Sequence, residues 1–440
     1  MTDSLGQGSF GAALVSSLNI GCAIEDTFKG KYSTRLGVMG LNSLILQDDI
    51  SKMNDKIEDA RMGCELIDET LKRKQLSVNY DKSKFLVLGS KKFRKETLDE
   101  LEQKPLKMGG VTIKHSEKEK YLGDYIHENG CVESITETIK SRTNGLIGKC
   151  DEIIEVSESP LMGGTGNSLT GIKLFEAQII PALLHNCESW IGVTETHIAD
   201  LETFQENFFK KLLHLPNSTP KAIIHWDSGF QSMKWRIAQK KLIFLRKLMT
   251  KNDTNIAKKA VENEFMFGIK GLGYECRQIT NKLGLPDVMF NDITKNQIKY
   301  AIKNADLEEK SQEMNESKKV GDRLADNTMD NKYLSYMCLP MSRIWVRYRA
   351  RMIKGVKMNH KGSYNDLNCR FCKQNVQESQ EHLEVCSETN YERRGLVLSD
   401  WEGKLGFWRR MNFKIAAVAP RVPQPVAVID QVPRICIAVT

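Results

Sequence analysis

The N-terminal part of the chain mixes strand-like and helix-like spacing of hydrophobic positions. An apolar run predicts a strand that ends at Asp48-Asp49, and residues 52–74 carry an apolar stripe at helical spacing. A glycine-rich loop and a helical run over 12–28 precede them. We therefore expect an α+β region over residues 1–130. Its strands are predicted at 36–47, 76–88, 105–114 and 121–126.

From residue 131 onward the strand signals fade and helical periodicity dominates. This pattern predicts a helical region over 131–260. A polar connector is expected over 261–340. Within it, the charge-dense stretch 305–330 is interpreted as a mobile linker. The four predicted helices of the helical region are 133–154, 169–184, 196–213 and 233–250.

The last hundred residues combine a basic helix, a Cys/His cluster and a tail. We place the helix and the cluster together in a unit over 341–390, with the helix at 342–354. Residues 391–440 are interpreted as a C-terminal tail, disordered from about residue 416, because valines and prolines dominate there.

Composition narrows the function classes. The net charge of +8 is modest, but lysines and arginines concentrate in 206–251 and 341–361, which suggests a polyanionic partner or two solvated helix faces. Eleven scattered cysteines argue against a disulfide framework and for a reducing compartment, nuclear or cytoplasmic. The longest apolar stretch is too short and too polar to span a bilayer, so no membrane partner is expected.

Asp48 and Asp49 form the first candidate site. Adjacent carboxylates repel each other and are tolerated in an exposed turn or with a cation between them. At the tip of a hairpin such a pair could hold Mg²⁺ (or Mn²⁺), which prefers carboxylate oxygens. On its own, the pair is equally well explained as an ordinary turn.

Four residues near the C-terminus have the spacing of a zinc site. The pattern is Cys369-x2-Cys372-x9-His382-x3-Cys386. Thiolates and an imidazole at this spacing can close a tetrahedral Zn²⁺ site, and four protein ligands make it structural rather than catalytic. The alternative is four reduced, unrelated side chains.

Two basic helices are candidate nucleic-acid contacts. Arginine pairs with phosphates and stacks on bases, and aromatic rings provide stacking platforms. Alternatively, the aromatic side chains face a core and the arginines are solvated. The candidates are Arg343, Trp345, Arg347, Tyr348, Arg349, Arg351 and Lys354 in the first helix, and Arg236 and Lys240 in the helix 233–250.

The order of these motifs resembles non-LTR retrotransposon reverse transcriptases over about residues 4–390. Leu5-Gly-Gln-Gly-Ser9 resembles motif B, Leu44-Ile-Leu-Gln-Asp48-Asp49 resembles motif C, and 76–84 with Asn79-Tyr-Asp-Lys82 resembles motif D. Tyr121-Leu-Gly123 resembles the segment that follows, 175–190 resembles the thumb, and the Cys/His cluster also occurs in that class. Motif A and the fingers have no counterpart, and Leu46 replaces the usual aromatic residue.

The resemblance implies a fold and residue roles. It implies a partial polymerase palm, a helical thumb and a small zinc knuckle. Asp48 and Asp49 would hold Mg²⁺, Gln7 and Gly8 would line the nascent base-pair pocket, and Lys82 would neutralise the leaving pyrophosphate. Without the family, Gln7-Gly8 reads as a helix-start turn and Lys82 as a surface lysine.

The implied function is transfer of a nucleotidyl group from a dNTP to a DNA primer, templated by RNA. We expect the chain alone to be inactive, because the first metal-binding Asp is missing and a separate polypeptide would have to supply the N-terminal half. The alternatives are a non-catalytic nucleic-acid-binding protein and a transposon remnant that folds poorly.

Overall fold

The three-dimensional arrangement comes from a computed structural model of the whole chain. Gln7, Gly8 and Asp48 lie outside the described residues, as do the predicted helix at 12–28 and the end of the tail. The structure describes residues 34–36, 39–41, 43–46, 49–159, 168–317, 334, 337–350, 352–353, 356, 366–372, 374–394, 396 and 401–418.

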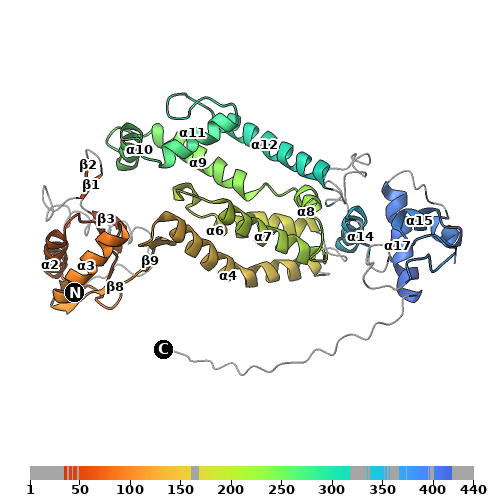
Figure 1. Cartoon of the computed structure of the whole chain (residues 1–440), viewed down its shortest axis with the longest axis horizontal. Helices are drawn as coiled ribbons and strands as arrows, with labels where there is room; N and C mark the ends of the chain where they lie inside the picture. Colours follow the sequence, from red (N-terminus) through yellow and green to blue (C-terminus); the bar gives the residue numbers. More distant parts are fainter. Residues whose placement is uncertain are drawn as a thin grey trace, which may run out of the picture.

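The described part of the chain is mostly helical, with a few short strands, which agrees with an α+β class. The described chain starts at one end of the long axis, doubles back through α9 and α12 in the middle, and reaches α14 and α17 toward the other end (Figure 1). The strands, α2 and α3 occupy one end, the long helices the middle, and α15 with α17 the other end. No described helix is long and apolar enough to cross a membrane.

The N-terminal strands are shorter than the sequence pattern suggests. The predicted strand 76–88 shrinks to β5, because a turn at Asn79–Ser83 interrupts it. Among the described residues every strand has one partner, so they form five two-stranded sheets rather than one broad sheet. The antiparallel pairs are β1 (Thr34–Leu36) with β2 (Met39–Leu41), β3 (Ser43–Leu46) with β4 (Asp49–Lys52), β6 (Lys107–Met108) with β7 (Val111–Thr112), and β9 (Lys118–Tyr121) with β10 (Asp124–His127); β5 (Lys84–Phe85) runs parallel to β8 (Lys114–His115).

Two helices give these strands a small core. The predicted helix 52–74 is confirmed as α2 (Ile57–Arg73), and α3 (Lys91–Gln103) follows it, capped by the Ser90 hydroxyl. Ile67 and Leu71 of α2 meet Leu101 of α3 in this core, where they escape water. Leu106 and Ile113, from the segment after α3, complete it.

The predicted helical region is confirmed. A π-helical turn, η2, lies inside the second helix, just before Pro181, whose ring removes one backbone donor. Phe175 of η2 stacks on Phe208 at 4.2 Å between ring centres, and both are buried. The elements are α4 (Cys131–Glu158), α5 (Ser168–Leu174), η2 (Phe175–Ile179), α6 (Ile180–Leu183), η3 (Cys187–Ser189), α7 (Glu195–Leu212), α8 (Lys221–Ser228) and α9 (Met233–Met249).

The expected polar connector is more ordered than its composition suggests. It contains α10 (Ile256–Met266), α11 (Leu272–Lys282) and the 22-residue helix α12 (Lys295–Glu316). The prediction of a mobile linker over 305–330 is therefore wrong for residues 305–316, which end α12. Ile298 and Ile302 of α12 pack with Trp235 of α9 in a second core. The rest of the predicted linker, 318–330, lies outside the described residues.

The C-terminal segment also differs from the expectation of a tail beginning at 391. The described elements are α14 (Leu339–Arg349), α15 (Gln380–Val385), η6 (Ser387–Thr389), α16 (Asn390–Arg393) and α17 (Trp401–Val418). Phe407 and Trp408 of α17 are fully buried. These rings offset the cost of ordering the segment, so a fold boundary at 390 is wrong.

One hydrophobic core joins the helical region to the C-terminal segment. It runs from Ile135 of α4 to Ile415 of α17. The buried hydroxyls of Ser168 and Ser342 also join the two parts, with a hydrogen bond of 3.0 Å between positions 174 apart in the sequence.

Candidate metal centre

A short hairpin and a short helix position the four Cys and His side chains. Asn368 and Gln377 form a β-bridge, and Cys369 N–H donates to the Val376 carbonyl at 2.8 Å. Cys369 and Cys372 lie in the turn of this hairpin. The helix α15 begins after Ser379, whose hydroxyl accepts a hydrogen bond from His382 N–H, and Cys386 follows the last helical residue.

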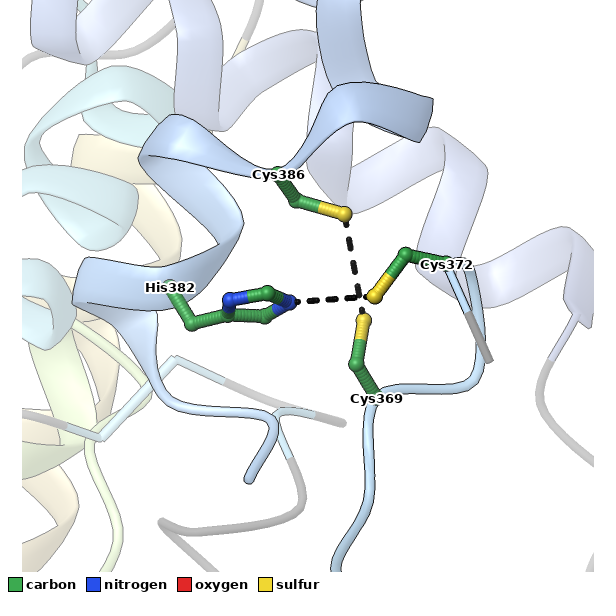
Figure 2. Close-up of side chains that lie close together, drawn as sticks. All are labelled: Cys369, Cys372, His382 and Cys386. Carbon is green, nitrogen blue, oxygen red and sulfur yellow. Dashed lines mark hydrogen bonds between the residues drawn. The ribbon is translucent and has the colours of Figure 1, made fainter. Parts of the chain in front are cut away.

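The four ligand atoms converge (Figure 2). All lie within 4.8 Å of one another. The Sγ atoms of Cys369 and Cys386 are 4.0 Å apart, and Cys372 Sγ lies 3.5 Å from His382 Nε2. Tetrahedral zinc with bonds of about 2.3 Å to sulfur and about 2.0 Å to nitrogen requires ligand separations of roughly 3.5–3.8 Å. The predicted convergence is confirmed, and this Cys3His cluster could bind a zinc ion.

Burial and hydrogen bonding act differently on the thiols. Burial raises the pKa of Cys369 to about 12. Burial also acts to raise the pKa of Cys372, but hydrogen bonds from the Gln374 N–H and the neighbouring thiols outweigh it and lower that pKa. The cluster can therefore hold one thiolate readily, and a metal ion would displace the other protons on binding.

A second layer of polar contacts holds the ligand-bearing segments. Arg370 donates two hydrogen bonds of 2.8 Å to the fully buried carboxylate of Glu378, which locks the hairpin. Thr389 Oγ1 donates to the Cys386 carbonyl at 2.7 Å, and Arg393 Nη1 donates to the same carbonyl at 2.8 Å. Such supporting contacts orient metal ligands before the metal binds.

The cluster is fastened to the rest of the fold. Gln380 Nε2 donates to the Tyr348 carbonyl of α14 at 3.2 Å, and Trp408 Nε1 of α17 donates to Glu384 Oε1 at 2.9 Å. Cys369 and Cys386 also belong to the large core. A metal ion here would stabilise the packing of α14, α15 and α17 together.

The basic helix α14 is used internally, which corrects its interpretation as a nucleic-acid contact. Trp345 is 5 % exposed and stacks on the equally buried Tyr348 at 5.4 Å, so neither ring is a platform for bases. Arg343 contacts Glu158 and the Leu212 carbonyl, and Arg347 donates to the His214 carbonyl. Arg349 pairs with the buried carboxylate of Asp227 at 3.1 Å. Arg351 and Lys354 lie outside the described residues.

The basic residues of α9 are likewise engaged. Arg236 forms a two-pronged ion pair with Glu176 of η2, with Nη1 to Oε2 at 2.9 Å. Lys240 donates to the Leu184 carbonyl at 2.7 Å. Both side chains hold α9 against the preceding helical segments. The expectation that they contact the phosphates of a nucleic acid is therefore corrected.

The two strands of the predicted carboxylate hairpin, with Asp49 but not Asp48, lie in the described backbone. Leu46 pairs with Asp49 at the end of the β3–β4 ladder, so residues 47 and 48 join the strands. Asp49 is exposed, and its charge contributes, after burial, to a raised pKa of Tyr121. Lys82 is exposed in the turn after Asn79, whose side chain accepts from its N–H.

Sequence reasoning missed the residue that holds this second hairpin. Arg142 of α4 donates to the Gly123 carbonyl at 2.9 Å and to the His185 carbonyl at 2.6 Å. Asn186 donates to the Leu122 carbonyl at 3.2 Å. The sequence does not single out Arg142, because Lys140 precedes it by two residues and the same predicted helix carries Glu133 and Glu137.

Comparison with protein-family models and with curated proteins found no match to this chain.

Proposed function

We propose that this chain carries palm, thumb and zinc-knuckle segments of an RNA-directed DNA polymerase of the reverse transcriptase type. The observation that carries the proposal is the β3–β4 hairpin, whose last register pair joins Leu46 to Asp49. Asp49 is exposed at the start of β4, and Asp48 precedes it directly in the sequence, so the two carboxylates could share a divalent cation.

The second hairpin supports the same reading. Burial and, after it, the charge of Asp49 raise the pKa of Tyr121. A primer end held by the β9–β10 hairpin would then lie next to the carboxylates. Arg142 and Asn186 hold the turn of that hairpin against α4 and η3, which suits a positioning role.

In this proposal Asp48 and Asp49 bind Mg²⁺ (or Mn²⁺), which would neutralise charge on the attacking and leaving oxygens of nucleotidyl transfer. Lys82 would neutralise the pyrophosphate. Among the described strands β3 pairs with β4 alone, so a third carboxylate would come from a segment outside them. A separate polypeptide can supply that segment, as well as contacts to the dNTP and the RNA template.

Iron-directed cleavage tests the metal site without requiring activity. Fe²⁺ replaces Mg²⁺ in carboxylate sites, and with ascorbate and peroxide it cuts the backbone near the ion. We expect cuts around residues 46–51 and around Tyr121, suppressed by Mg²⁺ and lost in Asp48→Asn and Asp49→Asn. Asp253→Asn is the matched control, because Asp253 is also highly exposed but pairs with Lys258 in another part of the fold.

Cleavage that is absent at the hairpin, or unchanged in both hairpin variants, would rule out this metal site. Templated dNTP incorporation is the activity readout, measured with a polypeptide that supplies the palm strand added to the chain. Incorporation that survives Asp48→Asn would contradict the assigned role of the pair.

A further inference from the structure

An exposed aromatic patch covers the turn between α10 and α11 and the loop before α12. Monomeric proteins rarely leave contiguous apolar side chains of this size in water, and those that do use them for binding. Phe290 is 64 % exposed and Phe267 is 57 % exposed. The patch consists of Phe265, Met266, Phe267, Ile269, Tyr274 and Phe290.

The fold fixes the patch in place. α10 ends at Met266, and Gly268, whose φ is +64°, turns the chain after Phe267. Beneath the turn, Val261, Leu272 and Cys276 are buried in the second core. The exposed rings therefore sit on a rigid base, and their exposure follows from the position of the turn rather than from loose packing.

Two cations lie over the rings. The Arg277 guanidinium is 4.7 Å from the ring centre of Phe265 and 5.8 Å from that of Phe290, and the two rings meet edge to face at 5.3 Å. Lys270 Nζ lies 5.9 Å from the Tyr274 ring centre. Aromatic faces interleaved with cations are the combination that holds unpaired nucleotides, whose bases stack and whose phosphates pair.

The local charge balance also favours an anionic ligand. The nearby carboxylates have partners within the fold. Glu275 pairs with Lys241 at 2.5 Å, Asp287 with Arg277 at 2.6 Å, and Glu264 accepts from the N–H groups that begin α11. Lys270 is exposed and has no ion pair among the described residues. Lys270 is therefore an exposed cation beside the rings that is free to pair with a phosphate, whereas Glu264 is held by neutral N–H groups and Asp292 lies 3.9 Å from Arg246.

The patch lies on the side of the candidate polymerase site. α10 and β3 occupy the same end of the long axis, whereas α15 with the metal centre lies at the opposite end (Figure 1). A strand leaving the Asp48-Asp49 hairpin thus has an aromatic surface at its own end of the molecule.

We propose that this patch binds single-stranded nucleic acid by stacking bases on Phe265, Tyr274 and Phe290, with Lys270 at a phosphate. The proposal rests on the proposed function for its biological setting, but its chemistry stands on the patch itself. It gives the chain a nucleic-acid contact separate from the basic helices α9 and α14, whose cations are engaged internally.

Fluorescence anisotropy tests the proposal with labelled single-stranded RNA and DNA of about 20 nucleotides, in separate arms. We expect Phe265→Ala, Tyr274→Ala and Phe290→Ala each to weaken binding about tenfold, and Phe290→Tyr to retain it. Lys270→Ala should reduce the slope of log affinity against log salt by about 0.7. Phe93→Ala is the matched control, since Phe93 is also about half exposed but lies on α3.

Three outcomes would overturn the proposal. The first is failure of the unaltered chain to bind either single strand. The second is equal binding by the three alanine variants, with unfolding midpoints by circular dichroism showing that they fold. The third is a loss of self-association, rather than of nucleic-acid binding, in those variants. Each differs from failure of the polymerase proposal, which is read from cleavage at the Asp48-Asp49 hairpin.

Discussion

Arg142 Nη2 on α4 donates to Asp124 Oδ1 at the start of β10, at 2.7 Å. The same guanidinium reaches the Gly123, Leu183 and His185 carbonyls, and it stacks on the Trp190 ring with 5.6 Å to the ring centre. One side chain thus ties a surface hairpin to two helical segments that are distant in sequence.

We expect Arg142→Ala to free the turn at residues 122–124 and to lower the free energy of unfolding by roughly 2–3 kcal/mol, because several charge-assisted hydrogen bonds are lost together. Hydrogen exchange at residues 121–125 should accelerate. Lys118→Ala is the control, since Lys118 lies on the same hairpin and pairs with Glu137 of α4 but is 47 % exposed, and such pairs contribute little. Equal exchange in the two variants would contradict the clamp.

Zinc binding can be checked by releasing the metal into a colorimetric chelator. The purified chain should yield about one zinc ion per molecule, and Cys369→Ser should abolish it, because three ligands remain for a site that closes with four. The variant should also unfold at a lower temperature, since the metal stabilises the packing of α14, α15 and α17. Cys131→Ser replaces an exposed cysteine outside the cluster and should keep the zinc. Unchanged zinc content in Cys369→Ser would exclude this site.

A variant of Arg236 tests whether this residue forms an internal ion pair or contacts the phosphates of a nucleic acid. Its side chain is 11 % exposed and pairs with Glu176. We expect Arg236→Ala and Glu176→Ala each to destabilise the fold by roughly 1–3 kcal/mol. Affinity for single-stranded RNA should stay the same in both. A large loss of RNA affinity in Arg236→Ala alone, with normal stability, would restore the phosphate-contact reading.

His225 makes the stability of the helical region dependent on pH. Burial acts to lower its pKa, but hydrogen bonds to Glu206 and Glu313 outweigh burial and raise the pKa to about 9. The charge of Glu202 also acts to raise this pKa, and Lys221 pairs with Glu206 at 3.1 Å. The imidazolium thus bridges α7, α8 and α12.

A raised pKa in the folded state means that the charged histidine stabilises the fold. This contribution, on the order of 3 kcal/mol, is fully present below pH about 6.5 and is lost as the pH rises through about 9. Urea unfolding between pH 6 and pH 10 should show the decline, and His225→Asn should remove most of it. If the free energy of unfolding falls equally with pH in the unaltered chain and in His225→Asn, titratable groups other than His225 cause the decline.

Much of the helical architecture could be predicted from the sequence. The predicted helices 133–154, 196–213 and 233–250 match α4, α7 and α9 to within four residues at each end, because their apolar stripes are the faces that the fold buries. The Cys/His cluster could also be predicted, because three cysteines and a histidine at this spacing within 18 positions favour a metal site over other interpretations.

The errors arose where a partner lies far away in the sequence. Arg343, Arg349 and Arg236 look like solvent-facing cations until Glu158, Asp227 and Glu176 come beside them from segments 60 to 185 residues distant. Periodicity reports which face of a helix is apolar. It does not show which carboxylate will pair with each arginine in the folded protein. The same limit hid α17, whose buried rings find their partners on α14.

The long sequence separation within the large core, of which the Ser168–Ser342 hydrogen bond is one example, has a consequence for biosynthesis. The large core contains side chains from both ends of a segment that spans more than 270 residues, from Ile135 to Ile415. Its contacts therefore have high sequence separation. During synthesis, the apolar side chains of α4 to α8 that pack against α14 and α17 stay exposed until those two helices leave the ribosome. A chaperone that shields apolar helix faces would act on this chain during that interval.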